Sequence, residues 1–401
     1  MRSCNPKILV TVTTLAVGGG AEKVAAMVAN GFAEKGIDTL VLTQYAAEDE
    51  HTVYVPRVNL GASLGEFHSL PRWRRRLTKV TRAWARMYGT ARICREQKVD
   101  IVVSFLEESN FYVIFAKILF RIPMRTIVSV RMDPNRYGRV YKFLIRKLYR
   151  HADAVVAVTR GIEETLRTEF HLNNVLTIYN PISVTAVQER AKEPLPKKWE
   201  FLANEQGYFI NVARLTYQKG QWHLLRAFKR VIDRDPSAKL VLLGDGEYRQ
   251  VLPVLIERLG ISGSVYLIGQ QDNIYPFLAH AGCFVFTSLF EGLPNSILEA
   301  LAMNLPVVSV DSTSGMRELL APELSLTEKI QYPYYGSRGV LVAPFPDEDV
   351  ATISEPKDGP YAELAGVLSN PPERSDMARQ VASEFSPSAI IDTWIRVANG
   401  V

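Results

Sequence analysis

The sequence predicts an α/β protein with two domains, each built on a parallel sheet. Short apolar segments that suit buried strands alternate along the chain with longer segments of helical periodicity, as in parallel sheets covered by helices. The 401 residues exceed the length at which a single hydrophobic core usually stops growing. A segment with several prolines and little periodicity divides the series. We therefore predict domains at residues 1–182 and 205–383, a linker at 183–204, and a final helical segment at 384–401.

Composition narrows the class of protein. Apolar residues make up 47% of the chain and charged residues 22%, which is ordinary for a folded soluble protein. The three cysteines, Cys4, Cys94 and Cys283, lie too far apart for a disulfide framework and favour a reducing cytoplasm. No apolar run reaches the roughly 18 residues of a membrane-spanning helix. The six histidines show no metal-ligand spacing.

The charge is distributed unevenly. Residues 1–182 carry 27 Lys and Arg against 16 Asp and Glu, whereas the remainder carries 20 against 26, within a net charge of +5. A basic half of this kind is typical of a protein that faces an anionic surface. The strongest contribution comes from residues 70–95, which contain nine basic residues and no acid: Arg72, Arg74, Arg75, Arg76, Lys79, Arg82, Arg86, Arg92 and Arg95.

The same basic segment has an apolar stripe at helical spacing, made of Trp73, Leu77, Val80, Trp84 and Tyr88. One interpretation is a helix that lies on an anionic membrane surface. Its contacts would then be Arg72, Trp73, Arg74, Arg75, Arg76, Lys79 and Trp84. The other interpretation is a surface helix whose stripe faces the core and whose arginines are solvated. No nucleic-acid-binding motif accompanies the segment.

The predicted N-terminal domain begins with a strand at residues 7–15, followed by Gly18, Gly19 and Gly20 and a helix at 21–34. Glycines at such a turn let backbone amides approach a phosphate, although many α/β proteins use them only to bend the chain. Further strands are predicted at 39–44, 100–105, 125–130, 154–158 and 175–179, and helices at 110–120, 137–150 and from 159. Arg131 follows the 125–130 strand, where it could bind a phosphate or form a salt bridge with Asp133 or another acid.

The predicted C-terminal domain begins with a strand at residues 209–213. Arg214 and Lys219 follow in the loop, where two cations can neutralise a pyrophosphate, although a lone Lys or Arg is usually only surface charge. Further strands are predicted at 239–243, 265–268, 282–287, 306–310 and 339–342, with an irregular excursion at 321–338. The final helix is predicted at 387–398. Asp347, Glu348 and Asp349 offer a D-x-D carboxylate pair, but in a proline-rich loop we interpret them as solvated acids.

The segment after the 282–287 strand combines acidic side chains with a helix N-terminus. Gly292 and Pro294 end the strand, and a helix is predicted from Ser296. Glu291 lies in the loop and Glu299 in the early turns of the helix. The free amides of Gly292, Leu293, Asn295 and Ser296 would point into the same crevice. Either acid alone would be unremarkable, but together they suit a ligand with anionic and hydroxyl groups, such as a sugar nucleotide.

Several of these segments resemble the retaining glycosyltransferases of family 4. Glu291 and Glu299 match the paired-glutamate motif of that family, and Arg214 and Lys219 lie in a matching loop. The resemblance continues through Gly244-Asp-Gly246 and Gly18-Gly-Gly-Ala-Glu22 and covers nearly the whole chain. It implies two facing Rossmann-like domains, the GT-B fold, with an interdomain cleft. Residues 1–182 would bind the acceptor, residues 205–383 the nucleotide sugar, and the final helix would pack back on the first domain.

The resemblance also implies roles for individual residues. Arg214, Lys219 and Glu291 would be catalytic. Donor binding would fall to Gly18, Gly19, Gly20, Gly244, Gly246, Gly269, Gly292, Leu293, Pro294, Asn295 and Glu299. Arg131 stands where relatives often have a histidine, so Arg131 and Asn110 would lie near the transferred sugar or the acceptor. No metal or other cofactor is expected beside the UDP-sugar donor.

The expected reaction is transfer of a hexose or N-acetylhexosamine, with retention, to a polyprenyl-diphosphate-linked glycan at the inner face of the cell membrane. Such a reaction belongs to polysaccharide or lipopolysaccharide biosynthesis. The alternatives are a nucleotide-sugar epimerase of the same fold and a transferase with a soluble acceptor. A phosphorylase would need a pyridoxal lysine site that the sequence does not offer. A non-catalytic membrane-binding protein would leave Arg214, Lys219, Glu291 and Glu299 without a role.

Overall fold

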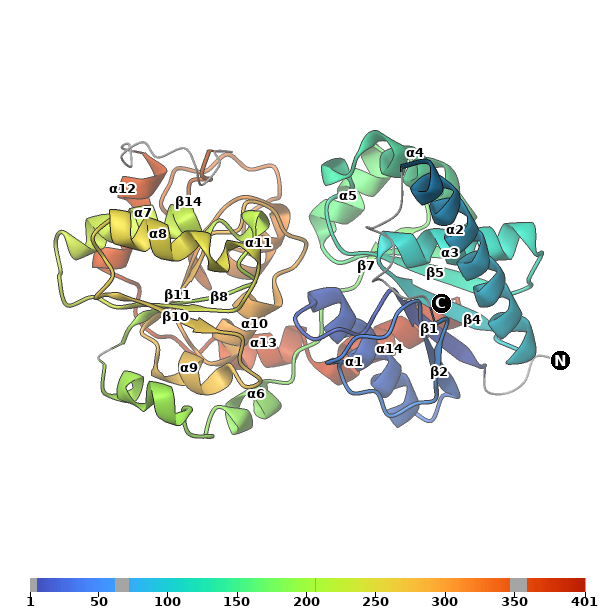
Figure 1. Ribbon diagram of the computed structural model, residues 1–401, viewed down its shortest axis with the longest axis horizontal. Helices are drawn as coiled ribbons and strands as arrows, with labels where there is room; N and C mark the ends of the chain where they lie inside the picture. Colours follow the sequence, from blue (N-terminus) through green and yellow to red (C-terminus); the bar gives the residue numbers. More distant parts are fainter. Residues whose placement is uncertain (1–5, 62–71, 206, 347–358, 401) are drawn as a thin grey trace. The chain divides into compact units, whose positions relative to one another are not determined.

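The computed structural model describes residues 6–61, 72–205, 207–346 and 359–400, without the side chains of 72–79. The chain forms two units (Figure 1). The N-terminal unit contains residues 1–181 and 387–401, and the C-terminal unit contains 182–386. Each unit has its own seven-stranded sheet.

The N-terminal unit alternates strands and helices along the chain. Its strands are β1 (Ile8–Val12), β2 (Thr39–Thr43), β3 (Arg57–Asn59), β4 (Ile101–Phe105), β5 (Arg125–Val130), β6 (Ala154–Ala157) and β7 (Val175–Thr177). Its helices are α1 (Gly20–Glu34), α2 (Arg72–Glu96), α3 (Glu107–Leu119), α4 (Arg139–Leu148), α5 (Arg160–Thr168) and α14 (Pro387–Asn399).

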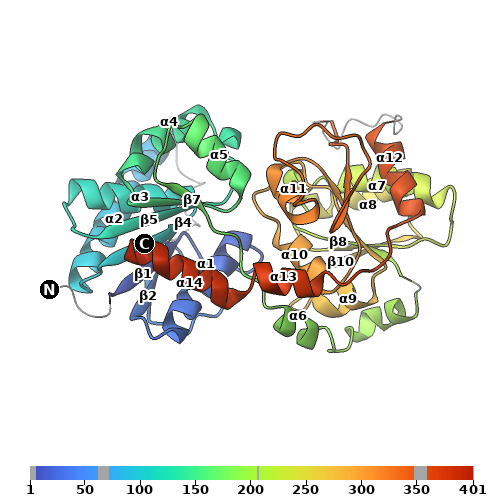
Figure 2. The same cartoon turned by 180° about the vertical axis from the view of Figure 1, so that it is seen from behind.

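The N-terminal sheet is parallel throughout, with strand order β3-β2-β1-β4-β5-β6-β7. Because side chains alternate along a strand, β1 contributes to two cores. Ile8 and Val10 pack with α1 and α14, and Leu9 packs with α2 and α3 on the other face. Figure 2 shows α14 beside α1, where Trp394 is fully buried with its ring centroid 5.5 Å from that of Phe105.

The C-terminal unit repeats the pattern with a second set of elements. Its strands are β8 (Phe209–Val212), β9 (Leu240–Leu243), β10 (Val265–Gly269), β11 (Cys283–Phe286), β12 (Val307–Val310), β13 (Tyr334–Gly336) and β14 (Gly339–Val342). Its helices are α6 (Val184–Arg190), α7 (Gln221–Ile232), α8 (Val251–Arg258), α9 (Tyr275–His280), α10 (Asn295–Ala302), α11 (Ser314–Leu320), α12 (Pro360–Ser369) and α13 (Ala378–Glu384).

The C-terminal sheet has the order β10-β9-β8-β11-β12-β14-β13 and is parallel except for its last strand. Helices α7, α8 and α12 share a core on one face, and Figure 1 shows α9, α10 and α13 on the other. The segment 321–338, expected to be irregular, contains β13. A two-residue turn folds β13 back against β14, so the pairing adds a strand that the sequence pattern did not reveal.

Two boundaries differ from expectation. Residues 183–204, predicted as a linker, belong by their contacts to the C-terminal unit, because α6 packs against α9, α10 and α13. Helix α3 begins at Glu107 and not at Asn110. Leu106, which precedes it, has φ +71° and turns the chain directly from β4 into the helix. The earlier start moves Glu107 and Glu108 out of a loop and into the first helical turn.

Candidate functional site

The residues of the C-terminal unit that the sequence predicts as a donor site lie around the point where its strand order reverses. Strands β8 and β11 are neighbours, and from them the sheet extends outward in opposite directions. In open α/β sheets, ligands bind outside the carboxyl ends of the strands at such a point. The loop after β8 carries Arg214 and Lys219, and the loop after β11 carries Glu291. The topology therefore brings two segments about 70 residues apart in sequence to one end of the sheet.

Lys219 and Glu291 meet directly across this point. The Lys219 Nζ forms an ion pair with Glu291 Oε1, and the two side chains are only 15% and 11% exposed. The Thr287 hydroxyl donates to the Lys219 carbonyl over 3.1 Å and fixes the loop against β11. Gly220, at φ +62°, completes the turn, and a Cβ there would lie 2.5 Å from the Thr287 carbonyl oxygen. The two loops are therefore held in contact by backbone and side chain together.

Arg214 lies in the same loop as Lys219 and is exposed, and its side chain makes no ion pair within the described part of the chain. Its loop is packed against the turn after β9. A Cβ on Gly244 would lie 2.0 Å from the Ala213 carbonyl oxygen, and one on Gly246 would lie 2.4 Å from that of Leu215. These two glycines are therefore required by packing between loops, whether or not a nucleotide lies beside them.

The remaining donor-site candidates of this unit follow β10 and β11. Gly269 ends β10 at φ +86° with the Arg249 side chain beside it. Gly292 and Leu293 are buried, and Pro294 is the N-cap residue of α10, so the helix begins at Asn295. No side chain caps that helix start. Its first amides therefore remain suited to an anionic ligand.

Glu299 lies one turn inside α10 and is 6% exposed. The Tyr275 hydroxyl, on α9, donates a hydrogen bond to Glu299 Oε1 over 3.3 Å. A buried carboxylate with such a partner has a fixed orientation. Tyr275 is a residue that the sequence reasoning missed, because nothing in its local pattern connects α9 to the paired-glutamate segment.

The glycine turn of the N-terminal unit joins β1 to α1. Gly18 has φ +99°, Gly19 is the N-cap residue, and Gly20 is the first residue of α1. The Glu22 carboxylate folds back over Gly19, where it would overlap any added Cβ. Burial of the His51 ring, together with the charge of Lys23, lowers the pKa of that imidazole. The turn is thus surrounded by ionisable side chains.

Arg131 and Asn110 lie at the carboxyl end of the same sheet, in the loop after β5 and in α3. The Arg131 guanidinium donates to the Asn180 side-chain oxygen. Among the described residues, Arg131 forms no salt bridge with Asp133. The Asp133 carboxylate accepts a hydrogen bond from the Asn135 backbone amide over 2.9 Å. Asn110 is fully buried and donates to the Ser129 carbonyl and to Tyr149, so it joins α3 to β5.

Glu107 is a second residue that the sequence reasoning missed. It is the first residue of α3, and its side chain is buried, with only 5% of the residue exposed. Burial raises the pKa of Glu107, with the nearby Arg131 acting in the opposite direction. Burial also lowers the pKa of Arg131, to about 10, so the guanidinium stays charged at neutral pH. The signal for Glu107 was hidden because the helix was expected to begin three residues later.

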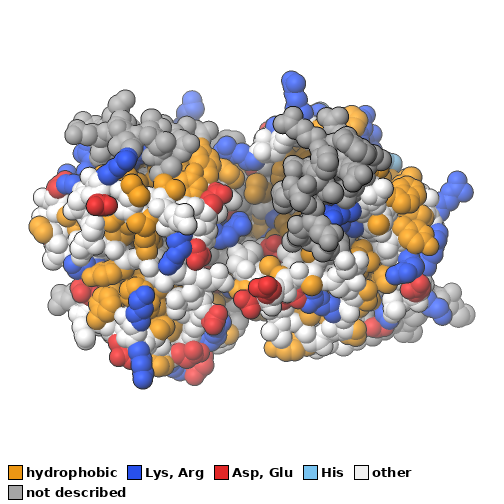
Figure 3. All heavy atoms as spheres, viewed as in Figure 1, with side chains coloured by type: hydrophobic (Ala, Val, Ile, Leu, Met, Phe, Trp, Pro, Cys, Tyr) orange, Lys and Arg blue, Asp and Glu red, His pale blue; other side chains and the backbone are white. Residues whose placement is uncertain are grey.

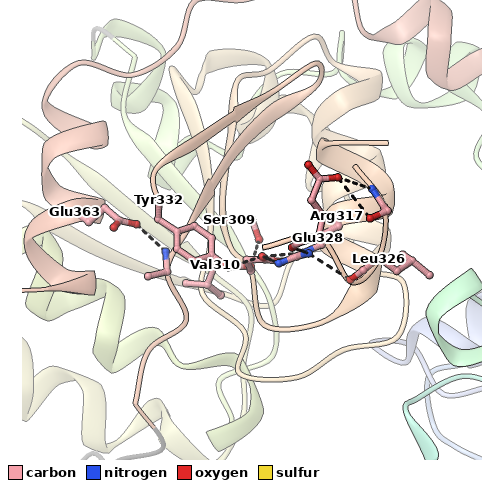
Figure 4. A network of polar contacts seen from close by, with 10 residues as sticks. Ser309, Val310, Arg317, Leu326, Glu328, Tyr332 and Glu363 are labelled. Carbon is pink, nitrogen blue, oxygen red and sulfur yellow. Dashed lines mark hydrogen bonds and ion pairs between the residues drawn. The ribbon is translucent and has the colours of Figure 1, made fainter. Parts of the chain in front are cut away.

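A separate polar network at the end of β12 is structural (Figure 4). Asp311 accepts hydrogen bonds from Arg317 over 2.6–3.0 Å and from the Tyr332 hydroxyl over 2.6 Å. Arg317 also donates to the Glu328 and Leu326 carbonyls. The hydrogen bond from Arg317 to Asp311 raises the pKa of that guanidinium. These contacts join α11 and β12 to the 321–338 segment and hold it in place.

Helix α2 exists as predicted, but Arg72, Trp73, Arg74, Arg75, Arg76 and Lys79 lie outside the described side chains. Along the described part, the apolar stripe faces solvent: Val80 is 69% exposed, and Trp84 and Tyr88 are 53% and 52% exposed. The face toward the core carries Ala91 and Cys94 instead. The interpretation that the stripe packs into the core is therefore wrong for Val80. The half-exposed rings of Trp84 and Tyr88 also pack against Phe120, with centroids 5.8 and 5.9 Å from that of Phe120.

Comparison with known proteins identifies the family. Residues 19–181 match the model described as glycosyl transferase 4-like domain, and residues 194–349 match glycosyl transferases group 1. An uncharacterized glycosyltransferase of Methanocaldococcus jannaschii is 36% identical over 338 residues, which cover 79% of this chain and 83% of that protein. The chain belongs to the two-domain glycosyltransferases of the GT4 type.

Two other proteins that resemble this glycosyltransferase agree with its assignment to the family. The Campylobacter jejuni N-acetylgalactosamine-N,N'-diacetylbacillosaminyl-diphospho-undecaprenol 4-alpha-N-acetylgalactosaminyltransferase is 30% identical over 241 residues, which are 58% of this chain and 63% of that enzyme. Anabaena HepE in complex with UDP and glucose has the same fold, with a TM-score of 0.72 at 17% identity and coverage of 99% of this chain and 100% of HepE.

Among the helices described here, none is both long and apolar enough to cross a lipid bilayer. Within residues 6–61, 72–205, 207–346 and 359–400, no group of three His, Cys, Asp or Glu side chains is arranged to hold a metal ion. Asp347, Glu348 and Asp349 lie outside these ranges.

Proposed function

We propose that this glycosyltransferase transfers a hexose or N-acetylhexosamine from a UDP-sugar to a polyprenyl-diphosphate-linked glycan, with retention at the anomeric carbon. The observation that carries the proposal is the Lys219–Glu291 pair at the reversal point of the C-terminal sheet. A cation and an acid held together at a ligand-binding edge suit a donor that is both a diphosphate and a polyhydroxylated sugar. UDP bound to HepE, which shares the fold, supports the choice of nucleotide.

The leaving diphosphate is stabilised by positive charge from this chain. As the bond from the anomeric carbon to the diphosphate breaks, negative charge grows on the phosphate oxygens. A lysine ammonium has three donors, so Lys219 can keep its bond to Glu291 and still donate to phosphate. Arg214 is exposed beside it, and the first amides of α10 add the positive end of a helix dipole. These groups would supply the charge stabilisation without a metal ion.

The two glutamates orient the donor in this proposal. By analogy with the family, Glu291 binds hydroxyl groups of the donor sugar and Glu299 binds the ribose hydroxyls. Carboxylates suit this task because they accept hydrogen bonds from hydroxyl groups. Tyr275 supports the assignment for Glu299, since its hydrogen bond fixes a buried acceptor in one orientation. Gly18, Gly19 and Gly20 are proposed to let the phosphates approach the backbone of the N-terminal unit.

The proposed acceptor lies at the cytoplasmic face of the cell membrane. Val80, Trp84 and Tyr88 of α2 expose apolar surface, and α4 exposes Val140 and Phe143 beside the basic residues Arg139, Lys142, Arg146 and Lys147. Figure 3 shows hydrophobic and basic side chains next to one another on this unit. Such surfaces bind the headgroup region of anionic bilayers. The name of the Campylobacter relative, whose acceptor is linked to diphospho-undecaprenol, supports the same class.

The test is incubation of the full-length protein with a panel of UDP-sugars, each with and without a short-chain prenyl-diphosphate-linked N-acetylhexosamine. Nuclear magnetic resonance of the product reports the anomeric configuration. We expect UDP release coupled to formation of an α-linked product from an α-linked donor. Conversion of the donor to an epimer without acceptor would favour the epimerase, and a β-linked product would refute retention.

A further inference from the structure

The last residue of helix α6 is joined to the loop that leads into α9. Helix α6 packs against α9 and α10 within the C-terminal unit (Figure 1). The Arg190 Nη2 donates to the Asp272 carbonyl over 2.9 Å, and the Asn273 side-chain amide donates to the Arg190 carbonyl over 2.8 Å. Two hydrogen bonds in opposite directions therefore hold the end of α6 against residues 272–273.

The same arginine covers the ring of Tyr275, the first residue of α9. The Arg190 guanidinium carbon lies 5.1 Å from the ring centroid, within the range in which a cation is attracted to an aromatic face. The Asn273 side-chain oxygen accepts a hydrogen bond from the Tyr275 backbone amide over 3.1 Å. The end of α6 thus holds the ring of Tyr275 directly and its backbone through Asn273.

Tyr275 connects these contacts to Glu299. Tyr275 is buried, and its hydroxyl donates to Glu299 Oε1 over 3.3 Å. This separation is longer than the roughly 2.7–2.8 Å that is common for hydrogen bonds between two oxygens. A small displacement of the ring would break the bond. The orientation of the Glu299 carboxylate therefore depends on the contacts that hold the Tyr275 ring.

Arg190 differs from an ordinary cation on the surface of a helix. In the described part of the chain, its side chain contacts a backbone carbonyl and an aromatic ring and forms no ion pair. Two residues later, Lys192 pairs with the Glu189 carboxylate over 2.6 Å, and those two side chains are 71% and 74% exposed. Exposed pairs of this kind contribute little to stability. The contacts of Arg190 instead restrain the residues beside it.

We propose that Arg190 is a positioning residue for recognition of the ribose of the donor. Arg190 holds Tyr275, and Tyr275 holds the Glu299 carboxylate where it accepts hydrogen bonds from the ribose hydroxyls. The inference deepens the proposed function and rests on its assignment of Glu299 to the ribose. Arg190, acting through Tyr275, then determines how strongly the enzyme prefers a ribonucleotide over a nucleotide that lacks the ribose hydroxyls.

The experiment compares binding of UDP and of dideoxy-UDP, which lacks both ribose hydroxyls, to the full-length protein by isothermal titration calorimetry. Loss of hydrogen bonds to a carboxylate predicts that the unchanged protein binds dideoxy-UDP about 10- to 100-fold more weakly than UDP. Arg190→Met keeps an unbranched side chain and removes the guanidinium. UDP should then bind about 2- to 10-fold more weakly, while binding of dideoxy-UDP stays within about twofold.

Further variants test whether the effect passes through Tyr275. Arg190→Lys keeps a cation near the ring and should retain part of the preference for UDP. In Tyr275→Phe, which already lacks the hydroxyl, adding Arg190→Met should change the preference by less than about twofold, because the two residues act through one chain of contacts. Lys192→Met is the matched control, since Lys192 pairs only with the exposed Glu189 carboxylate within the described residues, and it should prefer UDP as strongly as the unchanged protein does.

The positioning role is wrong if Arg190→Met prefers UDP as strongly as Lys192→Met does. A purely structural role would weaken binding of both nucleotides equally and lower the unfolding temperature, and that result also overturns the role. If Arg190→Met does not fold, Asn273→Ala replaces it, with a similar loss of preference expected because its bonds to Arg190 and Tyr275 are removed. Failure of the proposed function is seen in the unchanged protein, which would bind UDP no more tightly than dideoxy-UDP or would not bind UDP; either result removes the role of Glu299 and that of Arg190 with it.

Discussion

Lys219→Met is the substitution that follows most directly from the donor site. The change keeps the length of the side chain and removes the ammonium that pairs with Glu291. If Lys219 stabilises the leaving diphosphate, its loss resembles the loss of one preorganised donor to a developing oxyanion, which costs about 2.7–4 kcal/mol. Transfer should then slow about 100- to 1,000-fold. The effect should fall on kcat more than on the donor KM, because the charge develops in the transition state.

The burial of the Lys219–Glu291 ion pair also determines how much stability Lys219→Met should lose. With both side chains mostly buried, a hydrogen bond between charged groups contributes about 1.5–3 kcal/mol. One kcal/mol shifts the unfolding temperature of a unit of about 200 residues by about 2–4 °C. The unfolding temperature of Lys219→Met should therefore be several degrees lower than that of the unchanged protein. The variant should remain folded at 25 °C, where activity is measured.

The assay couples UDP release to product formation at saturating donor and acceptor, with calorimetry to follow unfolding. Lys229→Met is the matched control, because Lys229 also pairs with a carboxylate, Asp233, but on the surface of α7. An exposed pair at this spacing contributes about 0.3–0.5 kcal/mol, so this variant should transfer normally. Transfer by folded Lys219→Met within about threefold of the unchanged protein would refute the assignment of Lys219.

Three further predictions concern other parts of the molecule. Tyr275→Phe removes the hydrogen bond to Glu299 and should raise the donor KM about 2- to 10-fold with little change in kcat. An unchanged donor KM in steady-state kinetics would show that Tyr275 does not position Glu299 for the donor. Burial raises the pKa of Glu107, so folding becomes less favourable as pH rises above 4.5, the value of the exposed group. Glu107→Gln lacks that penalty, and its unfolding temperature relative to the unchanged protein should increase from pH 4 to pH 8. Trp84→Ser should weaken sedimentation with anionic vesicles, whereas Tyr335→Ser, which removes an exposed aromatic ring from the C-terminal unit, should not.

The meeting of Lys219 and Glu291 could be predicted from the sequence because its signals are local. Lys219 and Glu291 each follow a strand of obvious pattern, and the ends of neighbouring parallel strands meet at one edge of a sheet. The positions of most strands along the chain were also predictable from the alternation of apolar and helical segments. The hydrogen bond from Tyr275 to Glu299 was not, because it joins two helices that no periodicity relates.

The features of the N-terminal unit were harder to predict because they depend on tertiary structure. The sequence did not single out Glu107, because only the structure shows that the backbone turn at Leu106 starts α3 at this residue. The direction of the apolar stripe on α2 could not be derived from its spacing. A helix with two apolar faces gives no rule for which one packs inward, and here the face with Ala91 and Cys94 does.

Hydrogen–deuterium exchange of the full-length protein with and without UDP tests most directly whether the donor binds at the reversal point of the C-terminal sheet. We predict slower exchange in peptides that cover residues 214–220, 244–246 and 291–299 when UDP is bound. If calorimetry shows that UDP binds while those three segments exchange as fast as in its absence, the donor site lies elsewhere.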